Sequence, residues 1–187
     1  MPTKIYTKKG DFGLTNLYDT KQLNKNSNIF DALGDLDELS ANIGFLCSNT
    51  GNIEHSIVED LRWIQIMLLN IGSDISTKNV DKHILKDDTN ISLLEERTDF
   101  YNEKCSKLTE FILLGSKKLD SICHICRTIT RRAERNLWKS SDEYNISEYC
   151  FQFINRLSSF FFSLARYLSG TNEVTRSMYD KNNKYNY

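Results

Sequence analysis

The sequence predicts an all-α protein, a five-helix antiparallel bundle, and three observations lead to this prediction. Apolar residues recur at intervals of three and four over several long segments, which is the period of an amphipathic helix. The 187 residues include one proline and eight glycines, so few residues interrupt these segments. Each apolar stripe must be buried against another, which favours helices packed side by side within a single domain, residues 1–187.

The helical period is clearest where apolar residues alternate strictly by fours and threes, as they do from Ile57 to Ile75. A similar stripe begins at Ala32, and Gly170 is typical of the residue at which a helix stops. The segment that ends at Leu108 has a weaker pattern than the other four. Helices are expected at residues 29–47, 57–75, 93–108, 117–138 and 147–169.

Three segments lack the helical period. Residues 1–28 carry Gly10 and Gly13 on either side of Asp11, and we expect an ordered loop there. Residues 76–90 are polar and are expected to form a loop. Residues 171–187 are rich in Asn, Lys and Tyr, and we expect a loose tail.

Composition restricts the class of protein. The formal net charge is -1 and 40% of the residues are hydrophobic, so nothing in the total points to a polyanion or membrane partner. The apolar runs, such as residues 160–162, are far too short to cross a bilayer. Five cysteines without a secretory segment favour free thiols in a reducing, intracellular compartment. We expect the cytoplasm, or a mitochondrion if a presequence has been removed.

The densest charge lies on the fourth predicted helix, where five bases surround one acid, Glu134. The bases are Arg127, Arg131, Arg132, Arg135 and Lys139. A solvated basic face is the ordinary interpretation of such a run. Guanidinium groups on one rigid helix also match the geometry of phosphate oxygens. Asn155 and Arg156, in an otherwise apolar helix, need polar partners, which either a nucleotide or a neighbouring acid would supply.

The N-terminal loop between Thr7 and Thr15 has the composition of an anion-binding loop. Glycines allow backbone N–H groups to approach a phosphate, and Asp11 could hold Mg²⁺ directly or through water. The loop lacks the Gly-Lys-Ser/Thr ending of a P-loop, and the same residues also suit a plain turn. Alone, the loop does not decide between these interpretations.

Other polar groups have structural interpretations. Asp35, Asp37 and Glu38 form a small acidic cluster, in which we expect Asp37 to pair with an arginine. Cys123 and Cys126 are spaced like half of a zinc motif, but no second pair of ligands occurs at metal spacing, so core packing is the better interpretation.

Several segments resemble the PduO-type cobalamin adenosyltransferases, in the family's order and at about its spacing, over roughly residues 3–170. The segments are residues 4–13, 36–40, 111–113, 126–135 and 153–158. The resemblance implies a homotrimer with active sites between subunits. It also implies transfer of the 5′-deoxyadenosyl group of ATP to Co(I) of a corrinoid (cobalamin), with triphosphate as the leaving group and Mg²⁺ as a cofactor. A corrinoid reductase and an adenosylcobalamin-dependent enzyme are the further partners that it suggests.

The resemblance also assigns roles to individual residues. It implies catalytic roles for Arg132, Lys25 and Phe111, with Phe111 on the lower face of the corrin, and an ion pair of Arg127 with Asp37 across the subunit interface. The ATP contacts that it implies are Thr7, Lys8, Lys9, Gly10, Thr15, Asn16, Lys25, Arg131, Arg132, Glu134, Arg135 and Asn155.

The sequence departs from the family pattern at four positions. Leu114 replaces a proline, Ser116 replaces a glycine, Ser159 stands where an acid is usual, and a glycine is missing near Asp19. Two other functions fit the residues: a basic helical bundle that binds nucleic acid, and an interaction bundle that has lost catalysis. The first predicts binding that weakens steeply with salt, but interleaved acids and the near-neutral total charge speak against it.

Overall fold

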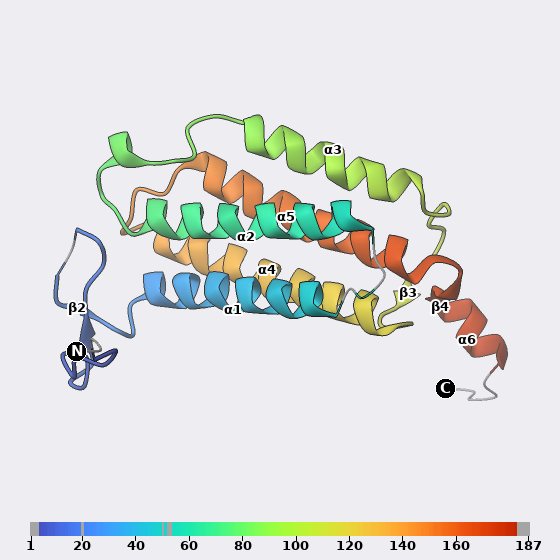
Figure 1. The fold of residues 1–187 in the computed structure, drawn as a ribbon, viewed down its shortest axis with the longest axis horizontal. Helices are drawn as coiled ribbons and strands as arrows, with labels where there is room; N and C mark the ends of the chain where they lie inside the picture. Colours follow the sequence, from blue (N-terminus) through green and yellow to red (C-terminus); the bar gives the residue numbers. More distant parts are fainter. Residues whose placement is uncertain (1–3, 20, 50, 52–53, 183–187) are drawn as a thin grey trace.

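The computed structural model describes residues 4–19, 21–49, 51 and 54–182, and this part of the chain is mostly helical (Figure 1). The prediction of a helical protein is confirmed. The helices are α1 (Asn28–Ser48), α2 (His55–Ile75), α3 (Thr89–Glu103), α4 (Lys118–Ser140), α5 (Glu148–Ser169) and α6 (Arg176–Asn182). Two short 3₁₀ turns are formed by Val80–Lys82 and Gly170–Asn172.

The five long helices lie side by side, and consecutive ones run in opposite directions (Figure 1). The helix α4 packs against α1 and α5, while α2 covers α1 and α3 covers α5. The predicted stripes form the core: Leu39, Leu61, Leu137 and Phe153 are all fully buried. Burying each such side chain contributes about 1.5–3 kcal/mol, so the stripes hold α4 in a central position.

A buried polar network joins α2 to α3. The hydroxyl of Tyr101 donates to Oδ2 of Asp60 at 2.7 Å, and Nε of Arg97 lies 2.9 Å from Oδ1 of the same carboxylate. Burial raises the pKa of Asp60, and burial followed by the hydrogen bond to Asp60 raises the pKa of Tyr101. Because a buried carboxylate needs such partners, the network sets where α3 packs.

The structure corrects the expected boundaries at three places. The third helix runs from Thr89 to Glu103 rather than over residues 93–108, so it begins inside the segment expected to be a loop. Two pairs of short strands occur in a chain predicted to be all-α: β1 (Leu14–Thr15) with β2 (Leu23–Asn24), and β3 (Ile112–Leu113) with β4 (Val174–Thr175). The expectation of a loose tail is wrong for residues 171–182, where β4 and α6 form, and residues 183–187 lie outside the described residues.

The cysteines are free thiols, as predicted. Cys123 and Cys126 are fully buried, which confirms that they pack in the core. Burial raises the pKa of Cys126 to about 12, and that of Cys150 also to about 12. In the described part of the chain, no helix combines the length and the apolar character needed to cross a membrane.

Candidate functional site

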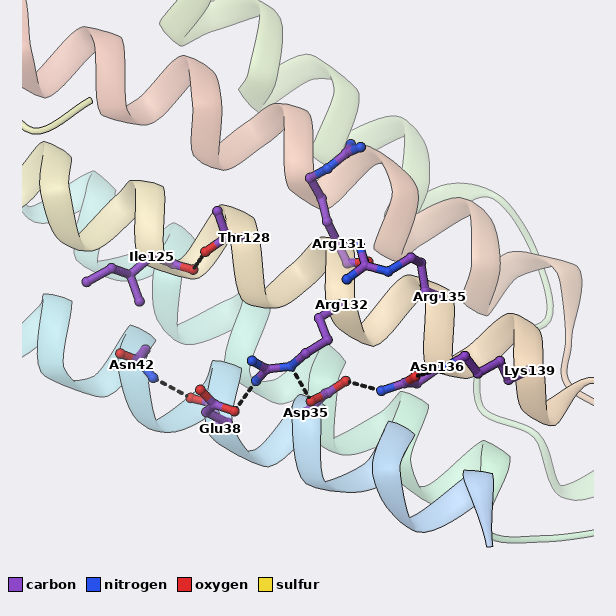
Figure 2. A network of polar contacts seen from close by, with 10 residues as sticks. All are labelled: Asp35, Glu38, Asn42, Ile125, Thr128, Arg131, Arg132, Arg135, Asn136 and Lys139. Atoms are coloured by element: carbon purple, nitrogen blue, oxygen red, sulfur yellow. Dashed lines mark hydrogen bonds and ion pairs between the residues drawn. The ribbon is translucent and has the colours of Figure 1, made fainter. Parts of the chain in front are cut away.

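Arg132 of α4 is bound to the acidic cluster on α1 (Figure 2). Its Nε donates to Oδ1 of Asp35 at 2.7 Å, and its Nη2 contacts the carboxylate of Glu38. Asn136, one turn further along α4, donates to Oδ2 of Asp35 at 2.7 Å. The hydrogen bond to Asp35 is the largest cause of a raised pKa for Arg132. Arg132 therefore joins α4 to α1.

Arg131 and Arg135 lie on a different side of the same helix. Both are exposed, and Figure 2 shows Arg131 pointing away from α1, opposite to Arg132. Nη1 of Arg135 donates to the backbone carbonyl of Arg131 at 2.9 Å, which folds the Arg135 side chain back onto the preceding turn of α4. Among the described residues neither guanidinium forms an ion pair. These two groups are therefore available to an anion such as a phosphate.

Arg127 and Asp37 do not meet within the chain. Nε of Arg127 is buried and has no hydrogen-bond partner in the described part of the structure. Burial and then the charge of Arg131 lower the pKa of Arg127. Asp37 is exposed and borders an apolar groove of about 230 Å³ between α1 and α2. Within one chain, the arginine that reaches the acidic cluster is Arg132, and it binds Asp35 and Glu38 rather than Asp37. The ion pair of Asp37 with Arg127 between subunits stays a prediction.

Polar residues of α5 find acidic partners. Nδ2 of Asn155 donates to Oε1 of Glu134 on α4 at 2.8 Å. Nε of Arg156 donates to Glu95 of α3 at 3.0 Å, and its Nη1 donates to Oδ1 of Asn155 at 3.1 Å. The sequence left open whether a nucleotide or a neighbouring acid would be the partner of Asn155 and Arg156, and within the chain each of them bonds an acid. The bridge between Glu134 and Asn155 fixes the α4–α5 surface beside the two exposed arginines.

The N-terminal hairpin, residues 4–19 and 21–25, borders an open cavity of about 610 Å³. Its lining is formed by Thr7, Lys9, Gly10, Leu14, Thr15, Asn16, Lys21 and Gln22. Five of these residues are among the predicted ATP contacts. Antiparallel pairing of β1 with β2 brings them together, and Oδ1 of Asn16 accepts the N–H of Gln22 at 2.9 Å. Sequence reasoning missed Lys21, which adds another ammonium group to the cavity.

Lys25 lies beside Gly10, although it is not part of that lining. A Cβ at Gly10 would come within 2.9 Å of Nζ of Lys25, so a side chain at this position would displace the ammonium group. The N–H of Lys25 donates to the carbonyl of Gly13 at 2.9 Å. Lys8 has a left-handed backbone, with φ of 61°, and Asp11 is exposed outside the cavity. The described residues contain no group of three or more metal-ligating side chains.

Asp19 attaches the hairpin to the end of α2. Its Oδ2 accepts the hydroxyl of Thr77 at 2.9 Å and the N–H of Lys78 at 2.7 Å. This role was missed, because an acid in a polar loop gives no periodic signal and its partners lie 58 and 59 residues away.

The two predicted halves of the ATP site lie apart in the fold. The hairpin lies beyond the ends of the helices, next to the start of α1 (Figure 1). In the described part of the chain, the hydrogen bonds found for Arg131, Arg132 and Arg135 stay within α1 and α4. These bonds do not join the halves within one chain.

Phe111, the predicted corrin contact, is 89% exposed. The loop that follows it departs from the family pattern. Leu114 is exposed, while Ser116 is bound twice: its N–H donates to Asp120 at 2.8 Å, and its hydroxyl accepts that of Ser169 at 3.0 Å. The serine that replaces a glycine thus ties the loop to α5. Ser159, the other departure on α5, is exposed.

Comparison with known proteins places these features in one class, the helical corrinoid-modifying transferases. A structure of a phenylalanine-to-alanine variant of the PduO-type ATP:corrinoid adenosyltransferase from Lactobacillus reuteri, complexed with cobalamin and ATP, is similar. Its TM-score is 0.86 at 34% identity, and the match covers 92% of this chain and 98% of that one. An arginine-to-lysine variant of the L. reuteri protein, complexed with ATP, has a TM-score of 0.82 at 34% identity, over 91% and 99% of the two chains.

Curated relatives agree. The corrinoid adenosyltransferase MMAB of Bos taurus is 35% identical over 185 residues, which cover 96% of this chain and 77% of the relative. The corrinoid adenosyltransferase of Bacillus subtilis is 33% identical over 180 residues, covering 95% and 93%. The model of the cobalamin adenosyltransferase family matches residues 5–168. The chain belongs to the cobalamin adenosyltransferase family.

Proposed function

We propose that this protein transfers the 5′-deoxyadenosyl group of ATP to the Co(I) of a corrinoid, releasing triphosphate. The observation that carries the proposal is the likeness, over nearly the whole chain, to a structure complexed with both cobalamin and ATP. Co(I) carries no proton, so the attack on the 5′ carbon needs no general base. The protein then acts by positioning the two substrates and by stabilising the charge of the leaving triphosphate.

We propose further that the active site forms between subunits of a homotrimer of five-helix bundles. The exposed arginines of one subunit and the hairpin cavity of the next would converge on one triphosphate. Two observations support an interface. Arg127 has a buried nitrogen without a partner, and Asp37 lies exposed at the edge of an apolar groove where Leu69 is also exposed. A carboxylate from a second subunit would partner the Arg127 guanidinium.

The contacts of the arginines suggest a division of labour among them. Arg131 and Arg135 are free of ion pairs among the described residues, and they would bind the triphosphate. Arg132, the catalytic arginine predicted from the sequence, already binds two carboxylates of α1, so we assign it the positioning of α4. Lys25, whose ammonium lies at Gly10, would neutralise the leaving group from the hairpin side. The neighbouring cavity residues would hold the rest of the nucleotide.

We also propose which residues contact Mg²⁺ and the corrin. Mg²⁺ usually keeps several waters and is bound through substrate phosphates with one or two carboxylates, and it would offset the charge of the triphosphate. Asp11 is the hairpin carboxylate that we propose for it. Phe111, exposed at the other end of the molecule, would contact the lower face of the corrin and exclude the dimethylbenzimidazole ligand.

The test is direct. The protein is incubated with ATP, Mg²⁺ and a chemically reduced corrinoid, and the absorption spectrum of the adenosylated product is followed. Formation of this spectrum, dependent on ATP, supports the proposal; its absence with intact, folded protein rejects it. The alternative of nucleic-acid binding is not favoured by the structure, because Arg132 is bound to acids of its own chain.

A further inference from the structure

Phe111 directly precedes a two-stranded ribbon, which consists of β3 and β4 and whose second strand comes from the C-terminal part of the described chain. Ile112 and Leu113, directly after it, pair antiparallel with β4, and Ile112 lies opposite Thr175. The carbonyl of Phe111 itself accepts the N–H of Arg176 at 3.2 Å. Because the ring is 89% exposed, side-chain packing does not hold this residue in place. Its position depends on the backbone pairing.

Glu110 closes the ribbon on the other side of Phe111. Its Oε2 accepts the N–H of Ser177 at 3.0 Å, and its Oε1 accepts the hydroxyl of Ser177 at 2.6 Å. Hydrogen bonds to an ionised carboxylate are roughly twice as strong as neutral ones. Both carboxylate oxygens therefore bind the first turn of α6, so the residue before Phe111 is tied to α6 and the two residues after it are tied to β4.

A buried guanidinium anchors the base of the ribbon. Arg166 of α5 is 5% exposed, and its Nε donates to Oε1 of Glu173 at 2.8 Å. Its Nη2 donates to the carbonyl of Ser106 at 2.7 Å. Ser106 lies between α3 and β3, and Glu173 precedes β4, so Arg166 of α5 joins the two segments that lead into the ribbon. The ribbon is thus fixed at its base by Arg166 and at its far end by Glu110.

We infer that Glu110 and Ser177 are positioning residues that present Phe111 to the corrin. The inference rests on the proposed function, in which Phe111 contacts the lower corrin face. An exposed ring on a free loop would lose conformational entropy when the corrin binds, and a fixed ribbon reduces this loss. Glu110 and Ser177 act through the backbone of Phe111 and need not touch either substrate.

Kinetics of three variants test the inference. Ser177→Ala removes the hydroxyl donor, Ser177→Thr keeps it, and Ser92→Ala changes an exposed serine on α3 as a matched control. We expect Ser177→Ala to raise the KM for the corrinoid about tenfold, the effect of one hydrogen bond to a charged group. The KM for ATP and the Tm should stay at wild-type values. Ser177→Thr should restore the corrinoid KM, and Ser92→Ala should match the wild type.

Hydrogen exchange gives a second readout that does not need activity. In Ser177→Ala and in Glu110→Gln, the amides of residues 111–113 should exchange faster, while those of α2 stay protected. Unchanged exchange in both variants would overturn the inference even if the wild type is inactive. Equal rises in both KM values together with a lower Tm would also overturn it, because they indicate general destabilisation. A wild type that forms no adenosylated corrinoid, yet shows the exchange effect, would instead reject the proposed function.

Discussion

The two halves of the proposed ATP site are built very differently. The arginine face of α4 (Arg131 and Arg135) belongs to the central helix, which packs on α1 and α5 and is tied to α1 by the ion pairs of Arg132. The N-terminal hairpin lies outside the helices, and Asp19 joins it to the end of α2.

The difference indicates which half is preorganised. Charged groups on a rigid helix keep their geometry without a ligand, so they suit the stabilisation of charge in a transition state. A hairpin with few tertiary contacts can open and close, which suits the entry and exit of a nucleotide. The arginine face should therefore govern turnover, and the hairpin should govern ATP affinity.

The largest effect is expected at Arg131. Arg131→Ala should lower kcat by about a hundred- to a thousandfold, since removing one donor to developing charge costs about 2.7–4 kcal/mol of barrier. Initial rates of adenosylated-product formation measure this, and Arg131→Lys, which keeps the charge without the planar fork, should fall in between. The assignment is contradicted if Arg131→Ala keeps near-normal turnover while Arg132→Ala is folded but inactive. In that case Arg132 is the catalytic arginine.

Arg132 should matter more for stability. Its removal takes a donor from Asp35, which is 8% exposed, and we expect Arg132→Ala to lower the free energy of unfolding by about 1–3 kcal/mol. Arg131→Ala, at an exposed position, should change it by less than about 0.5 kcal/mol. Urea unfolding measures both. A cycle with Asp35→Ala isolates the pair, and an interaction energy near zero would contradict the positioning role.

The helical fold could be predicted because its apolar seams are long and periodic. Leu61 and Ile64 of α2, for example, lie in a strict stripe and are fully buried. The ribbon near Phe111 could not be predicted in this way. Strands of two residues have no measurable period, and Ile112 pairs with Thr175, far away in the sequence.

Residue types in the site were predictable, but partners were not. The motifs identified a basic helix and a glycine-containing hairpin, and five predicted contacts do line one cavity. Which of two adjacent arginines faces α1 depends on how α4 is rotated against it, because neighbouring helix residues differ by about 100°. The sequence resemblance selected Arg132, whereas the ion pairs to Asp35 and Glu38 leave Arg131 as the exposed guanidinium.

Alkaline pH should loosen the helices and leave the hairpin alone, because the hairpin contains no cysteine. Burial raises the pKa of Cys126 and of Cys150 to about 12, from 9.0 in an unfolded chain. The stabilising effect of keeping these thiols protonated is complete below pH 9 and is lost as the pH rises towards 12. At pH 9.5 the loss should be about 1 kcal/mol per thiol. Between pH 9 and 12, the urea midpoint should fall less steeply with pH for Cys126→Ala than for the wild type. Equal slopes for the two proteins would contradict the raised pKa of Cys126.

The smallest effect is expected at the attachment of the hairpin. Asp19→Ala removes the acceptor of the bonds from Thr77 and Lys78, so the hairpin should move more freely while the helices keep their stability within about 0.5 kcal/mol. We expect the KM for ATP to rise between about twofold and tenfold, as for a lost hydrogen bond, with kcat at saturating ATP unchanged. Asp142→Ala, at an exposed turn after α4, is a matched control for removing one surface charge. If kcat falls and the KM for ATP does not change, the hairpin takes part in the rate-determining charge stabilisation, and the contrast between a catalytic helix face and an affinity-setting hairpin fails.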